Sequence, residues 1–150
     1  MVEPNSPPFA PTQAIIAVTL SWLISQVIKV IRGVLTRRRF NFRWLFDTGG
    51  MPSSHSATVG SLATAVGLYY GFNSILFLIT FVFTLITLLD AAGVRRSVGR
   101  QAGILNKMLD DLYEKGQVPE TRLKELLGHT PVEVLAGTFL GVLISLMICR

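Results

Sequence analysis

The chain has 150 residues, of which 50% are hydrophobic and only 15% are charged, and its formal net charge is +5 at pH 7. This length predicts one domain, and so apolar a composition excludes an ordinary soluble domain. Because the apolar residues fall in blocks near membrane-spanning length, we expect an all-α polytopic membrane bundle. The basic residues cluster beside these blocks, which favours contact with the lipid bilayer over contact with nucleic acid.

Residues 1–13 contain four prolines and no Lys or Arg, and we expect a disordered lead-in to a single domain spanning 14–150. The first apolar run, from Ala14 to about Leu35, is long enough to cross a bilayer, since ~20 helical residues span ~30 Å. Lys29 and Arg32 lie in its last third. Either side chain could extend to the interface, but an ionisable group as deep as Lys29 often faces a bundle interior. Both interpretations of Lys29 stay open.

A short stretch rich in Gly and Ser, Gly49–Ala57, follows a basic and aromatic segment typical of an interface loop, Thr36–Asp47. It contains His55, one of only two histidines in the chain. Glycine lets the backbone approach a ligand closely, and Pro52 suits the first turn of a helix. Serine hydroxyls and free N–H groups at a helix N-terminus bind oxyanions, so this stretch predicts an anion pocket.

Two apolar helices are expected after the pocket. The first, Pro52–Tyr70, has small residues on one face, which permits close helix contact in lipid. Those residues are Ser56, Gly60, Ala63 and Gly67. The next helix, Ser74–Leu89, is expected to end at Asp90–Arg96. From there to Gly128 we expect an amphipathic helical segment on the membrane surface, with a further short helix at Glu120–Leu127.

The last apolar run, Pro131–Cys149, brings the expected number of spans to about four. Four spans place Thr36–Met51 and Asp90–Thr130 on one side of the membrane, and these two segments hold eleven of the fourteen Lys and Arg residues. The positive-inside rule then makes this side cytoplasmic or stromal. The Gly137-x-x-x-Gly141 face could pack within one chain or between two copies, so a homo-oligomer stays open.

The second histidine, His129, opens the last helix, and Glu133 follows one turn later. At this spacing Glu133 can accept a hydrogen bond from one imidazole nitrogen and leave the other as a nucleophile or base. A lone His–Glu pair is more often a structural cap. Chemistry is favoured here because both His129 and His55 fall at membrane entries on the same predicted side, and because an intramembrane carboxylate is costly without a function.

Two motifs carry a family resemblance. Pro52-Ser53-Ser54-His55 is similar to the P-S-G-H motif of the phosphatidic acid phosphatase type 2/vanadium haloperoxidase superfamily, and His129–Gly137 resembles its H-x-P-x-D-V-L-A-G segment. With Asp90–Arg96, these strings resemble the divergent branch of that superfamily, over nearly the whole chain. The resemblance implies a phosphatase for a lipid phosphate or isoprenoid pyrophosphate, with a phosphohistidine intermediate and neither metal nor cofactor.

The resemblance also implies a role for each motif residue. His129 would attack phosphorus, with Glu133 orienting it in place of the family's Asp, and His55 would protonate the leaving group. Ser53, Ser54 and nearby N–H groups would hold the phosphoryl oxygens. The residue matching the lysine that opens the family's first motif is Lys29.

The chain also departs from the family pattern. Thr36 and Leu123 stand where the motifs have arginine, and Ser54 replaces a glycine. We expect other arginines to bind phosphate instead, since guanidinium groups suit bidentate phosphate contacts. These candidates are Arg95, Arg96 and Arg122. The departures equally support an alternative function, a catalytically lapsed membrane protein that binds anionic lipid or a partner through the same pocket. A third reading, haloperoxidase chemistry with bound vanadate, fits so small a membrane chain poorly.

Overall fold

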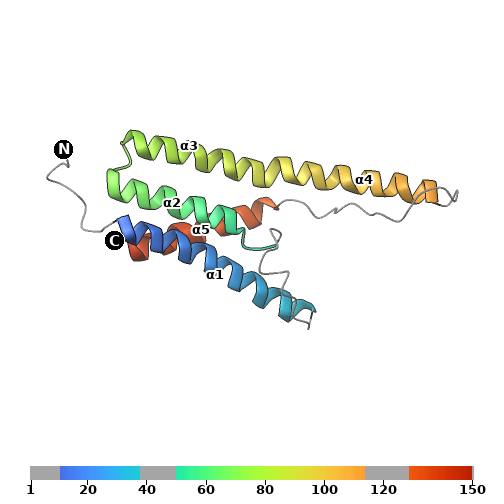
Figure 1. Ribbon diagram of the computed structural model, residues 1–150, viewed down its shortest axis with the longest axis horizontal. Coiled ribbons are helices and arrows are strands. Elements are labelled where there is room, and N and C mark those ends of the chain that lie inside the picture. The colour runs from blue at the N-terminus through green and yellow to red at the C-terminus, as the bar shows by residue number, and fades with distance from the viewer. Residues whose placement is uncertain (1–10, 38–49, 114–128, 150) are drawn as a thin grey trace.

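The computed structural model describes residues 11–37, 50–113 and 129–149, and these ranges contain helices and short connections without a strand. The helices are α1 (Pro11–Arg37), α2 (Ser54–Tyr70), α3 (Ile75–Leu89), α4 (Arg95–Tyr113) and α5 (Pro131–Ile148). Helices α1, α2, α3 and α5 form a bundle, and α4 extends beyond it (Figure 1). The all-α prediction is confirmed. Residues 1–10, the interface loop from residue 38 and the helix expected at 120–127 lie outside the described residues.

Helix α2 is the centre of the bundle, and it contacts α1, α3 and α5. The small face predicted for this helix is buried, as expected from its pattern. Serine side chains rather than large apolar ones fill the interior. The largest fully buried side chains of the described residues are Ser21, Ser25, Ser53, Ser56, Ser61 and Ser145. Lipid gives no hydrophobic drive for helices to associate, so small residues that permit close backbone contact suit this interior.

Large apolar side chains instead cover the outside of the bundle, mostly on α1, α3 and α5. In the described part of the chain, three helical stretches are long and apolar enough to cross a membrane: Pro11–Thr36, Ile75–Asp110 and Pro131–Ile148. The chain is therefore an integral membrane protein. Helix α2 has 17 residues and is not among these stretches, but it runs beside α5 through the bundle and is the fourth helix of the predicted membrane bundle (Figure 1). Its composition reflects contact with three other helices rather than with lipid.

The expected end of the third helix at Asp90–Arg96 is wrong. The chain stays helical there, because a π-helical turn, Asp90–Val94, joins α3 to α4. Helix α4 is amphipathic, as predicted, with Ile104, Met108 and Leu112 exposed along one side. Its position on the membrane surface remains a prediction.

The glycine motif of α5 packs within the chain, against α2. A Cβ atom on Gly137 would overlap the carbonyl oxygen of Ser53, and one on Gly141 would overlap that of Ala57. Because both helices advance together by four residues, α2 and α5 run parallel. Their N-termini therefore lie at the same end of the bundle, where α1 ends (Figure 1). This packing uses the face that could otherwise have joined two copies.

Candidate functional site

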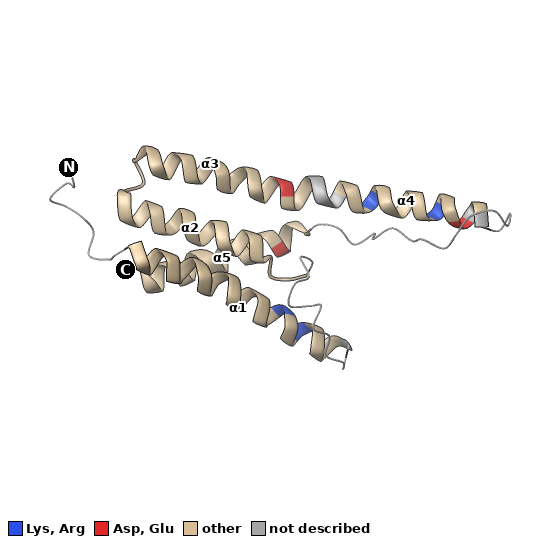
Figure 2. Ribbon diagram, viewed as in Figure 1, with Lys and Arg blue, Asp and Glu red and all other residues tan. Residues whose placement is uncertain are grey.

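The residues predicted to carry chemistry gather at one end of the bundle, which we call the histidine end. It comprises the first turns of α2 and α5 and the last third of α1. Figure 2 shows that the described Lys and Arg residues lie toward this end, while the end at the α2–α3 turn has none. Two parallel helices present their N-terminal N–H groups here, and such groups carry a partial positive charge.

Ser53 joins the two helix starts. It is the N-cap of α2, and its Oγ accepts hydrogen bonds from the Ser56 N–H at 3.3 Å and the Ser56 hydroxyl at 2.9 Å. The Ser53 N–H donates to the carbonyl oxygen of Glu133 at 3.0 Å. The described contacts of Ser53 thus fix α2 against α5.

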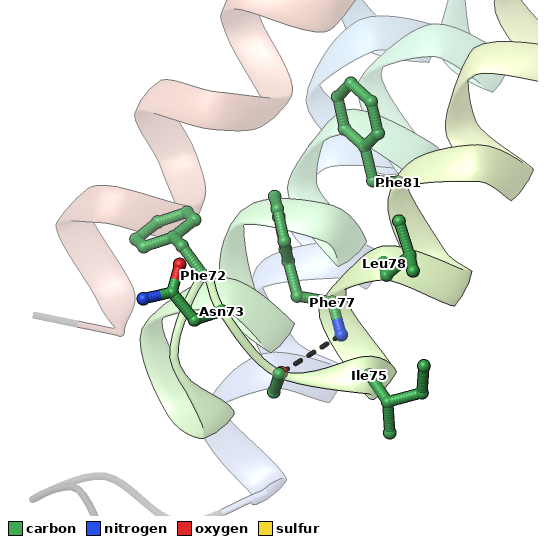
Figure 3. A pocket seen from close by; sticks show the side chains of 7 residues that line it. Phe72, Asn73, Ile75, Phe77, Leu78 and Phe81 are labelled. Atoms are coloured by element: carbon green, nitrogen blue, oxygen red, sulfur yellow. Dashed lines mark hydrogen bonds between the residues drawn. The ribbon is translucent and has the colours of Figure 1, made fainter.

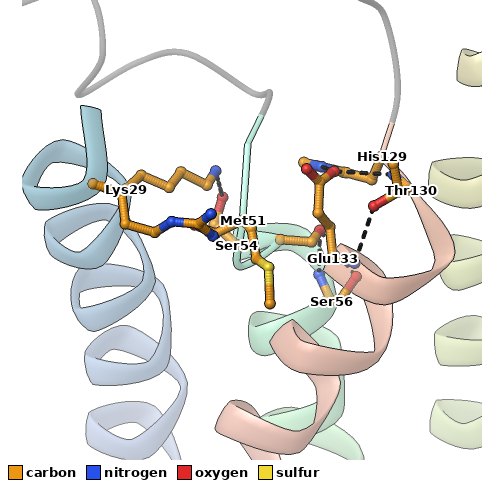
Figure 4. Close-up of polar contacts among 9 residues, drawn as sticks. Lys29, Met51, Ser54, Ser56, His129, Thr130 and Glu133 are labelled. Atoms are coloured by element: carbon orange, nitrogen blue, oxygen red, sulfur yellow. Dashed lines mark hydrogen bonds and ion pairs between the residues drawn. The ribbon is translucent and has the colours of Figure 1, made fainter. Parts of the chain in front are cut away.

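Lys29 reaches from α1 to the start of α2. Its Nζ donates to Ser54 Oγ at 2.9 Å, and the residue is only 8% exposed, so its ammonium points into the bundle (Figure 4). Of the two interpretations of this lysine, the structure favours the buried one over extension to the interface. The ammonium and the α2 N-terminus both carry positive potential, so an anion between them would be stabilised by both.

His129 and Glu133 form the predicted pair at the start of α5. His129 is 2% exposed, and its Nδ1 lies 3.3 Å from Glu133 Oε2. The same oxygen accepts the Thr130 N–H at 2.9 Å, while the Glu133 N–H donates to Thr130 Oγ1 at 3.3 Å, so Glu133 also completes a capping box. An ionised carboxylate only accepts, which places the hydrogen on Nδ1 and the lone pair on Nε2. Glu133 therefore caps the helix and orients the His129 imidazole at the same time.

The two histidines, far apart in sequence, are close in the structure. The ring centroids of His55 and His129 are 6.2 Å apart, with the rings tilted by 57°. His55 is the second residue of α2 and is half-buried. The parallel packing of α2 and α5 brings the rings together, because each histidine lies within one residue or two of its helix start.

Arg32 is a cation at this end that was not singled out as a site residue from the sequence. It lies one turn beyond Lys29, is exposed, and its Nη1 donates to the carbonyl oxygen of Met51 at 3.5 Å. That carbonyl belongs to the turn before α2, in which Gly50 has φ +94° and the Met51–Pro52 peptide is cis. Because Arg32 lies three residues after Lys29, the two cations share one face of α1, and this spacing could have indicated Arg32 from the sequence.

Arg95 and Arg96 are the first residues of α4, directly after the π-helical turn. The carbonyl oxygen of Ala91 in this turn accepts the His129 N–H at 3.0 Å, so the backbone of this region adjoins the histidine end. The side chains of both arginines, and the whole of Arg122, lie outside the described part of the structure. Phosphate binding by these three residues stays a prediction.

The opposite end of the bundle contains an open depression at the α2–α3 turn (Figure 3). Its lining is mostly apolar and carries no ionisable side chain. The lining residues are Phe72, Asn73, Ser74, Ile75, Phe77, Leu78 and Phe81. Over residues 11–37, 50–113 and 129–149, no three His, Cys, Asp or Glu side chains are grouped to hold a metal ion. The polar chemistry of the described residues is therefore concentrated at the histidine end.

Comparison with known proteins gives one family and one curated relative. The sequence profile of the Divergent PAP2 family matches residues 11–144, which include every residue of the histidine end. The chain is 41% identical over 137 residues to an uncharacterised membrane protein, YuiD, of Bacillus subtilis (strain 168). That alignment covers 84% of this chain and 87% of the relative. No solved structure matches the chain.

Proposed function

The chain belongs to the Divergent PAP2 family, and from this premise we propose that it is a membrane-embedded phosphatase. Its substrate would be a lipid phosphate or an isoprenoid pyrophosphate. The observation that carries the proposal is the pairing of His55 and His129 at 6.2 Å, beside the cation of Lys29. This spacing suits two rings that act on one phosphoryl group between them.

The reaction would proceed in two steps. First, Nε2 of His129 attacks phosphorus, the bond from phosphorus to the leaving oxygen breaks, and His55 gives its proton to that oxygen. A water then attacks the phosphohistidine, the phosphorus–nitrogen bond breaks, and His55 takes the proton of the water. Glu133 keeps the His129 Nδ1–H in place through both steps, which stabilises the cationic imidazole as it forms.

Charge that develops on the phosphoryl oxygens would be balanced from α1 and α2. Lys29 and the Ser54 hydroxyl already share a hydrogen bond of 2.9 Å, and the N–H groups at the start of α2 add partial positive charge. Ser53 supports this arrangement by capping α2. Arg32, at the rim, replaces one of the family's arginines in the proposal, and Arg95, Arg96 and Arg122 are further candidates.

We place the histidine end at the cytoplasmic or stromal face. The support is the asymmetry of charge, since the described Lys and Arg residues lie toward this end and cytoplasmic loops carry an excess of both. The single cysteine, Cys149, can be replaced by serine and a new cysteine placed at Asn73, in the opposite turn. An impermeant maleimide should label Cys at 73 in intact cells; labelling only after the cells are opened would reverse the orientation.

A second candidate function is binding of an anionic lipid without turnover. The observation that favours it is the absence of two motif arginines, since Thr36 and Leu123 stand at their positions. Vanadate, a phosphate analogue, separates the two functions. Tight vanadate binding with no hydrolysis across a broad panel of lipid phosphates would favour the binding protein.

The phosphatase is tested by release of phosphate from lipid phosphates and isoprenoid pyrophosphates, with purified protein in detergent and EDTA. His129→Ala should lower the rate at least ~10³-fold, because it removes the nucleophile. Asn73→Ala, at the far end of the bundle, is the matched control and should keep the parent rate. Full turnover by the His129 variant would remove the proposed nucleophile.

A further inference from the structure

The π-helical turn between α3 and α4 has a carbonyl that bonds outside its own helix. In a π-turn, N–H groups bond to carbonyls five residues back rather than four, so one such turn inside an α-helix leaves a carbonyl without a helical donor. A buried carbonyl without a donor is costly and is normally paired elsewhere. Ala91, within the turn, is buried, and its carbonyl oxygen accepts the His129 N–H at 3.0 Å.

The donor of this bond has no acceptor in its own helix. His129 precedes Thr130, the N-cap of α5, so its N–H lies before the first helical turn. The start of α5 is thus held from two sides. The Ala91 carbonyl holds the His129 backbone on the side of α3, and the Ser53 N–H holds the Glu133 carbonyl on the side of α2.

His129 is held both through its side chain and through its backbone, and the two contacts act differently. Glu133 fixes the imidazole through Nδ1, but it belongs to the same helix and moves with it (Figure 4). Only contacts to other elements can fix where α5 begins relative to His55. The bond to Ala91 is made by His129 itself, so it acts most directly on the position of the imidazole.

We infer that the Asp90–Val94 turn positions His129 for attack on phosphorus, with the Ala91 carbonyl as the contact that does so. The inference rests on the proposed function, because placement of His129 matters for turnover only if this residue is the nucleophile. Ala91 touches no reacting atom, so it is a positioning residue. Small displacements of a reacting group are costly, and ~1 Å can lower a rate by ~100-fold.

The sharpest test removes the backbone N–H of His129, which donates to the Ala91 carbonyl, and keeps the imidazole. Cell-free synthesis with the α-hydroxy acid analogue of histidine at position 129 replaces the amide with an ester. An ester at Asn73, in the α2–α3 turn at the opposite end of the bundle, is the matched control. Loss of one positioning hydrogen bond should lower kcat about tenfold, with KM within about twofold of the parent, whereas the Asn73 ester should leave both constants unchanged.

A second readout does not depend on turnover. Carbethoxylation of His129 by diethyl pyrocarbonate, followed by mass spectrometry, should be several-fold faster in the His129 ester because the imidazole is held less firmly. If the parent protein releases no phosphate, the proposed function fails. The carbethoxylation rate then still tests whether the hydrogen bond to the Ala91 carbonyl holds His129 in place. If the parent is active and the ester keeps both its kcat and its carbethoxylation rate, the positioning role fails alone. An ester that raises KM and keeps kcat also overturns it.

Deletion variants test the turn by a genetic route. Removing Ala92 shortens the turn by one residue, so that a regular α-helix can form through it. Removing Gln101, an exposed residue of α4, shortens the chain equally and leaves the turn intact. The Ala92 deletion should lower kcat at least about tenfold more than the Gln101 deletion. Equal losses in the two variants would contradict a specific role for the turn.

Discussion

The two ends of the bundle are built from the same helices, yet they differ in polarity and in helix direction. At the histidine end, α2 and α5 both begin, and buried Lys29 and His129 lie beside their first turns. At the opposite end both helices finish, and the surface is aromatic and uncharged around Phe72 and Phe77. Helix N-termini attract anions and C-termini repel them. Parallel packing therefore makes one end suited to phosphate and leaves the other suited to the membrane interface.

This comparison shows how a small bundle can form an anion site without large loops. Close contact between α2 and α5 requires Gly137 and Gly141, since a Cβ at either position would overlap an α2 carbonyl. The same contact sets the two helix starts side by side, and with them the two histidines. The register in which α5 packs against α2 thus sets both the close glycine contacts and the closeness of the two histidines.

After His129→Ala, the variant expected to lower the rate of phosphate release at the histidine end most is His55→Ala. This variant removes the proposed general acid, which typically contributes ~10²–10⁴-fold to a rate. The loss should be smaller for substrates with good leaving groups, such as a nitrophenyl phosphate, because these need no protonation. An equal loss with good and poor leaving groups would argue against His55 as the acid.

A smaller effect is expected from Lys29→Met, which keeps much of the buried volume but removes the ammonium. Removing one cation from a buried phosphate site should weaken vanadate or phosphate binding by ~10–100-fold, because the remaining groups are mostly dipoles. Lys107→Met, on the exposed side of α4, is the matched control and should bind as the parent does. Calorimetry or competition assays measure the difference, and equal affinities for the two variants would exclude Lys29 from the anion site.

The smallest effect is expected at the exposed rim. Arg32→Gln should raise KM only about two- to fivefold, because an exposed charge is screened by water and salt. The difference from the parent should shrink as salt is raised from low to physiological concentration. A loss as large as that of Lys29→Met would show that Arg32 enters the site itself.

Much of the fold could be predicted from local signals. The apolar runs gave the approximate bounds of α1, α2, α3 and α5. The small face of α2 and the glycine motif of α5 predicted close packing. Their mutual contact could not be assigned, because such motifs serve equally well within a chain or between chains.

The errors of sequence reasoning arise where tertiary contacts override local pattern. Asp90-Ala91-Ala92-Gly93 resembles the end of a helix, since glycine and a polar residue follow an apolar run. The chain nevertheless continues as a π-turn, and the carbonyl released there pairs with the distant His129 N–H. Likewise, the contact of Lys29 with Ser54 depends on how α1 packs against α2, which spacing along either helix does not encode.

The candidate site was predicted in parts rather than as a whole. The histidines, Glu133 and Lys29 followed from their residue types and positions together with the motif resemblance, and the structure brings these groups to one end. The distance between the histidine rings and the contact of Arg32 with the turn before α2 depend on how the helices pack, which the sequence does not give.

The central claim is that His129 carries the phosphoryl group during turnover. Purified protein in EDTA should be quenched under alkaline conditions during reaction with a lipid phosphate or pyrophosphate, digested, and analysed by mass spectrometry. The account predicts an acid-labile phosphoryl group on His129, absent from the His129→Ala variant. Turnover that leaves the phosphoryl group on His55, or on no residue while water attacks directly, would contradict it.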